Sequence, residues 1–555
     1  MKMRRNRLNN GFVGNGQLQN SLTGCISLNK HAIDNLYVQQ FVRPYSRPSE
    51  WVALPTVSAS EQKVVLICAV YDNDSNFTSF VFQGNYTVDW GDGSGTSSFS
   101  SGVTAEKIYT RATYSALSSS VYRGYKTLLI TITPQAGQNL TSMTLCQRHS
   151  NASLPSFYGQ GILAVRMSAP NLTTAFFASA DEAGSLTASN PMLEEIEWIG
   201  SAPLTSFRVS AAFKLRNIIS FPSTRNCTSM SAIFYRCYSL QLLPPGMFET
   251  NSATDFLACF LDCTSLLEVP SFNTNACTSG NGMALMFTNC LALLRIGDFR
   301  SNHIKNFSQA FQNCPSLIEI PPIDISSSTD NSQMFSGAGS LREIKGNFAT
   351  PSVSATNYNS MFANAAALQE LPAINLANAT TATSFMNGVR SVRSVPPLNM
   401  PLVTNTTSFF NNCTQLEEIS GMTTGTALTN ITTMFSDCRA LKRIPNFNTS
   451  KVTNATSAFN ACYSLTEVPN LDFSSITNMT TSLANTRSLA RFQVTGITSA
   501  SFSVAGAILG ATQLNEIYTN LGTAAGSPTI TVTGNWGTAT DNTAIATGKG
   551  WTVSG

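Results

Sequence analysis

Residues 434–445 read MFSDCRALKRIP, the clearest copy of the pattern that decides the fold of this chain. The pattern is Phe-x-x-Cys-x-x-Leu-x-x-Ile, often followed by Pro. About 14 copies, spaced mostly 24 or 25 residues apart, predict a stack of structural repeats in which each repeat buries its apolar face against the next. Further close copies begin at Phe234, Phe260, Phe287, Phe311, Phe410 and Phe459, and degenerate copies begin at Phe335, Phe362 and Met386.

The repeat at residues 446–469 divides into a polar half and an apolar half. Asn, Thr and Ser dominate residues 448–457 and favour turns and caps. Phe459, Cys462 and Leu465 lie three residues apart, a step that predicts one helical turn followed by a short strand. We therefore predict a mixed α/β solenoid, a leucine-rich-repeat stack at residues 186–521, with buried columns of Phe, Cys and Leu.

The strings M-F-x-x-C-x-x-L-x-x-I-P and N-T-S-x-V-T-N resemble BspA-type leucine-rich repeats. That family is found on surfaces of bacteria and protists and in bacteriophages, and its members are generally binders and adhesins. The resemblance therefore implies a binding protein and not an enzyme. The ending T-I-T-V-T-G-N-W-G, residues 529–537, also resembles the tail of such proteins, and we predict a C-terminal cap at residues 522–555.

Seven of the 13 cysteines occupy the same repeat position, in the apolar half. This placement indicates a column of buried thiols that act as small hydrophobic groups. A metal site needs convergent ligands. Only Cys259 and Cys263 are close together, and no His accompanies them. We predict no metal and no cofactor.

Residues 1–60 lack a clear period, and prolines within residues 41–55 prevent a regular helix. We predict an extended docking arm that packs either on the next domain of its own chain or on a neighbouring protein. Three arginines near the start are weak grounds for a nucleic-acid partner, and we predict none. The candidate docking residues are Arg4, Arg5, Arg7, Arg43, Tyr45 and Trp51.

Residues 61–135 are rich in β-branched and aromatic residues and predict an all-β domain. Within it, residues 88–95 read VDWGDGSG and resemble a turn of PKD-type immunoglobulin-like domains, which implies a β-sandwich spacer. Residues 136–185 are then a connector and N-terminal cap. Asp72, Asp74 and Asn76 alternate like the start of a calcium loop, but the Gly and Glu that an EF-hand needs are missing, so we predict a solvated turn.

Composition and motifs point away from catalysis and membranes. Only 11% of the residues are charged, the net charge is +3, and no apolar run of 18 residues exists, so we predict no membrane insertion. We find no nucleophile elbow and no phosphate loop. Carboxylates that follow the leucine position by two residues, such as Glu319 and Glu467, are expected to point outward. A carbohydrate-cleaving fibre with paired carboxylates stays an alternative.

Two non-enzymatic functions remain. The first is a bacteriophage structural protein on the virion exterior, a tail or head fibre or decoration protein, joined to other virion proteins by its N-terminal arm. The second is a bacterial cell-surface adhesin. We see no secretory signal in residues 1–20 and recognise no anchor, which favours the virion.

The outward residues that follow the leucine position vary from repeat to repeat, and they form the predicted binding face. A regular row of changeable side chains can bind an extended or multivalent partner through many weak contacts. The expected partner is a glycan or protein of the host surface. The candidate binding residues are Arg295, Arg342, Glu417 and Lys442.

Overall fold

The structure is a computed structural model that describes residues 45–151, 153–154, 161–178, 190–348 and 355–555. The chain divides into two units, Met1–Pro44 and Tyr45–Gly555, and all described residues belong to the second. Four of the predicted docking residues therefore lie outside the described residues: Arg4, Arg5, Arg7 and Arg43.

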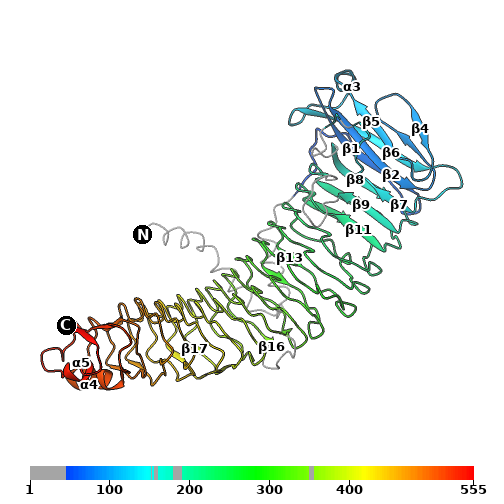
Figure 1. The fold of residues 1–555 in the computed structure, drawn as a ribbon. Coiled ribbons are helices and arrows are strands. Elements are labelled where there is room, and N and C mark those ends of the chain that lie inside the picture. The colour runs from blue at the N-terminus through cyan, green and yellow to red at the C-terminus, as the bar shows by residue number, and fades with distance from the viewer. Residues whose placement is uncertain (1–44, 152, 155–160, 179–189, 349–354) are drawn as a thin grey trace, which may run out of the picture. The chain divides into compact units, whose positions relative to one another are not determined.

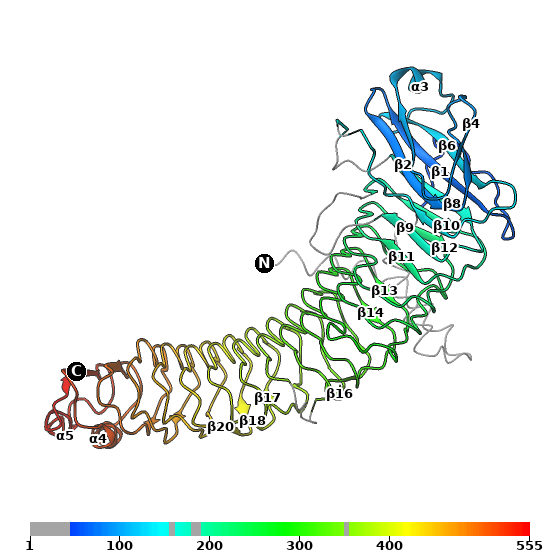
Figure 2. The same ribbon diagram turned by 45° about the vertical axis from the view of Figure 1, so that its right-hand side comes forward.

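Two β-sheets pack face to face in the N-terminal part of the described unit (Figures 1 and 2). The seven-stranded sheet runs in the order β12 (Asn217–Ser220), β10 (Glu195–Trp198), β8 (Ile162–Ser168), β1 (Lys63–Tyr71), β6 (Tyr125–Pro134), β3 (Tyr86–Asp89) and β4 (Thr96–Phe99). The five-stranded sheet runs in the order β11 (Ser206–Val209), β9 (Thr174–Ala178), β7 (Ser142–Thr144), β2 (Asn76–Gln83) and β5 (Ala105–Tyr109).

The two sheets change from antiparallel to parallel pairing as the chain proceeds. Strand β1 pairs antiparallel with β6 and β8, whereas β8, β10 and β12 pair in parallel, as do β7, β9 and β11. The sheets therefore run past residue 135: β7, β8 and β9 come from the predicted connector, and β10, β11 and β12 come from the predicted repeat region. The expectation of an immunoglobulin-like sandwich that ends before the repeats is wrong, because its sheets continue into the first coils.

Residues 45–60 pack on this same unit. Trp51 is buried, and its Nε1 donates a hydrogen bond to the Tyr125 hydroxyl at 3.2 Å. Arg166 donates to the carbonyls of Leu54 and Pro55, each at 3.1 Å. This segment covers the face of β1 that carries Val65, Ile67 and Ala69, while the opposite residues of β1 face the second sheet. For residues 45–60, the structure shows packing on the chain's own domain.

Beyond β12 the chain forms coils that pair in parallel, one on the next, through very short strands (Figures 1 and 2). Glu268 pairs with Arg295 and Ser394 with Glu418, 27 and 24 positions further on. The paired strands are β13 (Glu268–Val269), β14 (Arg295–Ile296), β15 (Ile323–Asp324), β16 (Gly346–Asn347), β17 (Ser394–Val395), β18 (Leu398–Met400), β19 (Glu418–Ile419), β20 (Met422–Thr424), β21 (Glu467–Val468) and β22 (Arg491–Phe492).

The prediction of a mixed α/β solenoid is wrong. The described chain is mostly strands and turns, and its helices are α3 (Arg111–Ala116), α4 (Ala511–Asn520) and α5 (Ala544–Thr547). The predicted helical turn over Phe459–Cys462 is not a helix. Ser457 and Ala461 on either side of Phe459 have positive φ, 52° and 56°.

Backbone hydrogen bonds explain why no helix forms there. In an α-helix each N–H points along the helix axis to the residue four positions earlier. Here the N–H groups of Phe459 and Ala461 donate to the carbonyls of Ser482 and Ala484 in the next coil, at 2.9 and 2.8 Å. Alternate amides are thus committed to the neighbouring coil.

Apolar columns run through the interior of the stack. The rings of Phe234 and Phe260 are stacked, with centroids 5.2 Å apart and planes 4° apart. Similar stacking continues as far as Phe362, is interrupted where Met386 replaces Phe, and resumes from Phe410 to Phe459. The predicted phenylalanine column is confirmed, with one interruption.

The predicted cysteine column is confirmed as well. Cys413, Cys438 and Cys462 are fully buried and free, as are all cysteines in the described ranges. The Cys438 thiol donates to the Phe410 carbonyl of the preceding coil at 3.1 Å, and the Cys462 thiol donates to the Phe435 carbonyl at 3.0 Å. Burial raises the pKa of Cys462 to about 12.

The far end of the stack is closed by β23 (Phe502–Ser503), β24 (Thr529–Thr531), β25 (Thr552–Ser554), α4 and α5. Strand β24 lies in the ending quoted above, residues 529–537, and the short helix α5 follows it within the predicted cap at residues 522–555. Trp551 is buried, and its Nε1 donates to the Gly522 carbonyl at 3.0 Å.

Substitutions at Cys438 test the column. We expect Cys438→Ala to lower the free energy of unfolding by about 1 kcal/mol, because one hydrogen bond and a small buried volume are lost. Ala338 and Ala365 hold this position naturally. Cys438→Asp buries a carboxylate without a partner and is expected to cost about 3 kcal/mol or more. Urea unfolding followed by circular dichroism measures both values.

Thiol reactivity gives an independent check. Since the Cys438 thiol is buried and its pKa lies well above the usual range, iodoacetamide should not alkylate it in the folded protein at neutral pH. Equal destabilisation by Ala and Asp, or rapid alkylation before unfolding, would contradict the packing described.

Candidate binding faces of the stacked coils

The first candidate face, here called the strand row, consists of the residues one and two positions after each leucine position. Arg342 and Lys442 follow Leu341 and Leu441 directly and are exposed. Glu417 follows Leu416, and its side chain is 33% exposed. Three of the four predicted binding residues therefore hold the first position of this row.

Arg295 lies one residue out of the register predicted for it. The first position after Leu293 is held by Leu294, which is buried, so Arg295 takes the second position. Its side chain is 17% exposed, and Nη2 lies 3.0 Å from Oε2 of Glu268 in the preceding strand. The adjacent leucines in this coil explain the error, because either one fits the repeat pattern.

Charges in the strand row compensate one another from coil to coil. Glu417 accepts hydrogen bonds from Lys442 and Arg393, both at 2.8 Å. The hydrogen bond from Lys442 has the largest effect and that from Arg393 the next, and together they lower the pKa of Glu417 below its usual range. Arg491 similarly lies between Glu467, at 3.9 Å, and Glu516, at 2.9 Å. Such exposed pairs contribute little to stability. Because opposite charges lie side by side, the strand row carries little net charge.

A second face was not anticipated. It consists of four rows, each beginning with the sequence Thr-Asn-x-Thr, and we call it the threonine–asparagine face. In each row the first Thr is exposed and the Asn is exposed or half-buried. The asparagines pair in parallel from coil to coil. The rows are residues 404–408, 429–433, 453–457 and 477–481.

Each Asn of this face holds a turn. Asn430 Oδ1 accepts hydrogen bonds from the backbone N–H of Thr432 at 2.9 Å and from its hydroxyl at 2.7 Å. Asn454 and Thr456 repeat the geometry at 3.0 and 2.7 Å. The Asn-x-Thr triplets thus have a structural cause, since an Asx turn needs these side chains. Their strict period was the sequence signal for this face.

A shallow pocket of about 410 Å³ lies on the coils near residues 225–300. Arg225 and Glu249 stand on its rim, with Nη2 and Oε2 2.8 Å apart, and the side chains of Phe248 and Phe272 contribute to its lining. Arg300 lines it as well. These residues come from separate coils, and no sequence motif marks them.

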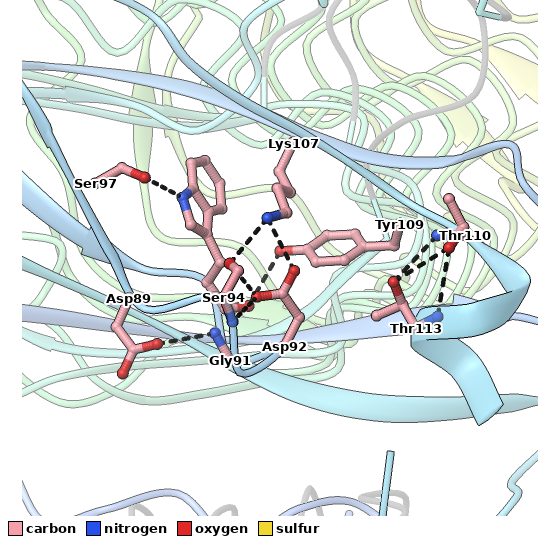
Figure 3. Close-up of polar contacts among 10 residues, drawn as sticks. Asp89, Gly91, Asp92, Ser94, Ser97, Lys107, Tyr109, Thr110 and Thr113 are labelled. Carbon is pink, nitrogen blue, oxygen red and sulfur yellow. Dashed lines mark hydrogen bonds and ion pairs between the residues drawn. The ribbon is translucent and has the colours of Figure 1, made fainter. Parts of the chain in front are cut away.

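The turn that resembles PKD-type domains is tight and is held by its own side chains (Figure 3). Gly91 and Gly93 have φ of 71° and 80°, and a Cβ at Gly91 would lie 1.9 Å from the Leu129 carbonyl oxygen. Asp89 Oδ1 accepts from Gly91 N at 3.0 Å, and Lys107 pairs with Asp92 at 2.9 Å. The Asp89 and Asp92 carboxylates in Figure 3 therefore both stabilise the turn itself.

Other candidate groups also have local partners. Asp72 pairs with Arg111 at 3.2 Å, and Asp74 accepts from the Arg111 N–H at 2.7 Å. His149 Nδ1 lies 3.6 Å from Glu106. Across the described ranges, no group of three or more His, Cys, Asp or Glu could hold a metal ion. No helix in those ranges is long and apolar enough to cross a membrane.

The coils match a family model described as "Mycoplasma protein of unknown function, DUF285" in three overlapping stretches, residues 205–317, 281–396 and 391–495. Together they span residues 205–495, which is 291 of the 555 residues. The chain belongs to the DUF285 family. The DUF285 matches fall on the stacked coils, and they confirm the predicted resemblance at the level of BspA-like repeats.

Other comparisons add little. A similar solved structure is described as "Plant peptide hormone receptor RGFR1 in complex with RGF2". It is 11% identical, covers 67% of this chain and 86% of that chain, and has a TM-score of 0.16, so it carries no argument. No curated protein matches the chain.

The register of Arg295 can be tested by charge reversal. Arg295→Glu removes the pair with Glu268 and places a carboxylate between Glu268 and Glu319 in adjacent parallel coils. We expect a loss of about 2 kcal/mol in the free energy of unfolding. The matched control, Arg342→Glu, changes an exposed residue and should stay within about 0.5 kcal/mol. Equal effects in urea unfolding would refute this placement.

Proposed function

We propose that this chain is a non-enzymatic attachment protein on the exterior of a virus particle, a fibre or decoration protein. Its stacked coils bind a glycan or protein of the host surface, and the strand row makes that contact. The N-terminal residues join the protein to other virion proteins. The resemblance to BspA-type repeats, known from bacteriophages and cell surfaces, supports this place of action.

One observation carries the proposal. Positions inside the coils hold nearly the same residues throughout, whereas positions of the strand row differ from coil to coil. The buried leucine position is Leu341, Leu416 and Leu441 in three coils, and the residue after it is Arg, Glu and Lys. Packing restricts the first set, and only an outside partner or solvent restricts the second.

The geometry suits attachment through many weak contacts. The coils carry outward side chains at the close, regular spacing that parallel pairing imposes, roughly 4.8 Å. Such a row offers no deep pocket, and avidity then comes from the number of coils engaged.

Location and binding can be tested together. Purified particles should contain the chain by mass spectrometry, and the isolated protein should compete with particles for adsorption to host cells. Arg342→Glu combined with Lys442→Glu should lower adsorption several-fold, because both side chains are exposed in the strand row. Stability should hardly change.

Lys451→Glu supplies a charge-reversed control, since Lys451 is exposed and lies outside the strand row. Adsorption that falls equally in this control would remove the strand row from the mechanism. Finding the chain in a bacterial envelope and never in particles would replace the virion with a cell-surface adhesin.

A further inference from the structure

We propose that the threonine–asparagine face binds an uncharged, extended polysaccharide that runs along the stack with about one sugar residue to each coil. This face differs from the strand row, and the inference does not depend on where the protein acts. It is carried by three properties of the face: its lack of charge, its free amide donors and its period.

The four rows contain no charged residue. Residues 404–408, 429–433, 453–457 and 477–481 read TNTTS, TNITT, TNATS and TNMTT. The strand row of the same coils carries Arg393, Glu417, Lys442, Glu467 and Arg491. A partner with fixed charges would find no counter-charge on the threonine–asparagine face, whereas sugar hydroxyls need only neutral donors and acceptors.

Each row supplies an amide donor. The Oδ1 atoms of the asparagines are occupied by their own turns, but the Nδ2 groups have no acceptor within the described chain. An amide nitrogen carries two N–H donors. These donors stand on one face and recur once in each coil at Asn405, Asn430, Asn454 and Asn478.

The period of the donors matches an extended sugar chain. The asparagines of neighbouring rows pair in parallel, so the rows repeat at the spacing of paired strands, roughly 4.8 Å. One pyranose unit of a β-1,4-linked chain spans a similar length. A polysaccharide parallel to the stack can therefore meet one asparagine donor in each of these four coils.

The face is also held in place before any ligand arrives. Thr453 N and Oγ1 donate to the Thr429 carbonyl at 2.9 and 3.3 Å, and Thr477 repeats this contact to Thr453. The asparagine side chains are fixed by two hydrogen bonds each. Little side-chain entropy is then lost on binding, which favours many weak contacts in a row.

Asn430→Asp with Asn454→Asp separates recognition from folding. Asp keeps the Oδ1 acceptor that the turn needs, and the chain already uses it, because Asp330 accepts from Ser332 N at 2.8 Å at the equivalent position. Asp removes the Nδ2 donor and adds charge. The double variant should fold and lose polysaccharide binding about tenfold or more.

The measurement is retention of the full chain on microcrystalline cellulose and on chitin, both uncharged β-1,4-linked polymers. The native protein should be retained on at least one, and retention should survive 1 M NaCl because no charges take part. A control with the same two changes outside both faces, Asn446→Asp with Asn470→Asp, should bind like the native protein, because both residues are exposed.

Three results would overturn the proposal. If the native protein binds neither polymer, this inference is refuted, while attachment through the strand row is unaffected. Equal binding by the asparagine double variant moves the site elsewhere. Sedimentation of the protein without polysaccharide shows that this face pairs with a second copy of the chain.

Discussion

Hydrogen bonds between alternate backbone amides and the next coil are the constraint on which the stack depends. Ile431, Thr433 and Phe435 donate to carbonyls 23 positions further on, at 2.8 to 3.0 Å. Of the intervening amides, Met434 N donates three residues back to the Ile431 carbonyl, and Thr432 N donates to the Asn430 side chain. This alternation forces positive φ at two residues in most coils, and it brings the coils close enough for their phenyl rings to stack.

The alternation also decides which side chains each position accepts. The residue before the cysteine position has positive φ, and it is usually Asn, Asp or Gly, which tolerate that conformation. Gly337 and Gly388 take the place that Asn313 and Asn412 hold elsewhere. At the cysteine position the thiol finds a carbonyl of the preceding coil, so a small residue with a weak donor fits better than a larger one.

Much of this could be predicted from the sequence, because period and burial depend on local pattern. The strands predicted within residues 61–135 are present, and the phenylalanine and cysteine columns follow from the repeat. The helical turn was mispredicted because a three-residue step fits both a helix and this alternating turn. The Asn or Asp before Cys, as at Asn313 and Asp437, was the contrary signal. The continuation of the sandwich sheets into the coils rests on pairing between distant segments, which no local pattern encodes.

The same constraint accounts for the two different faces. Where the chain is extended, the charged side chains of the strand row pair with one another across coils, so their charges vary from coil to coil. Where alternate amides leave the coil, the turns need an Asn or Asp side-chain oxygen to satisfy the backbone, so the sequence there is repetitive. Variation is therefore confined to one side of the coil, and regularity to the other. A partner that recognises a changing pattern must use the first face, and a partner that is itself periodic must use the second.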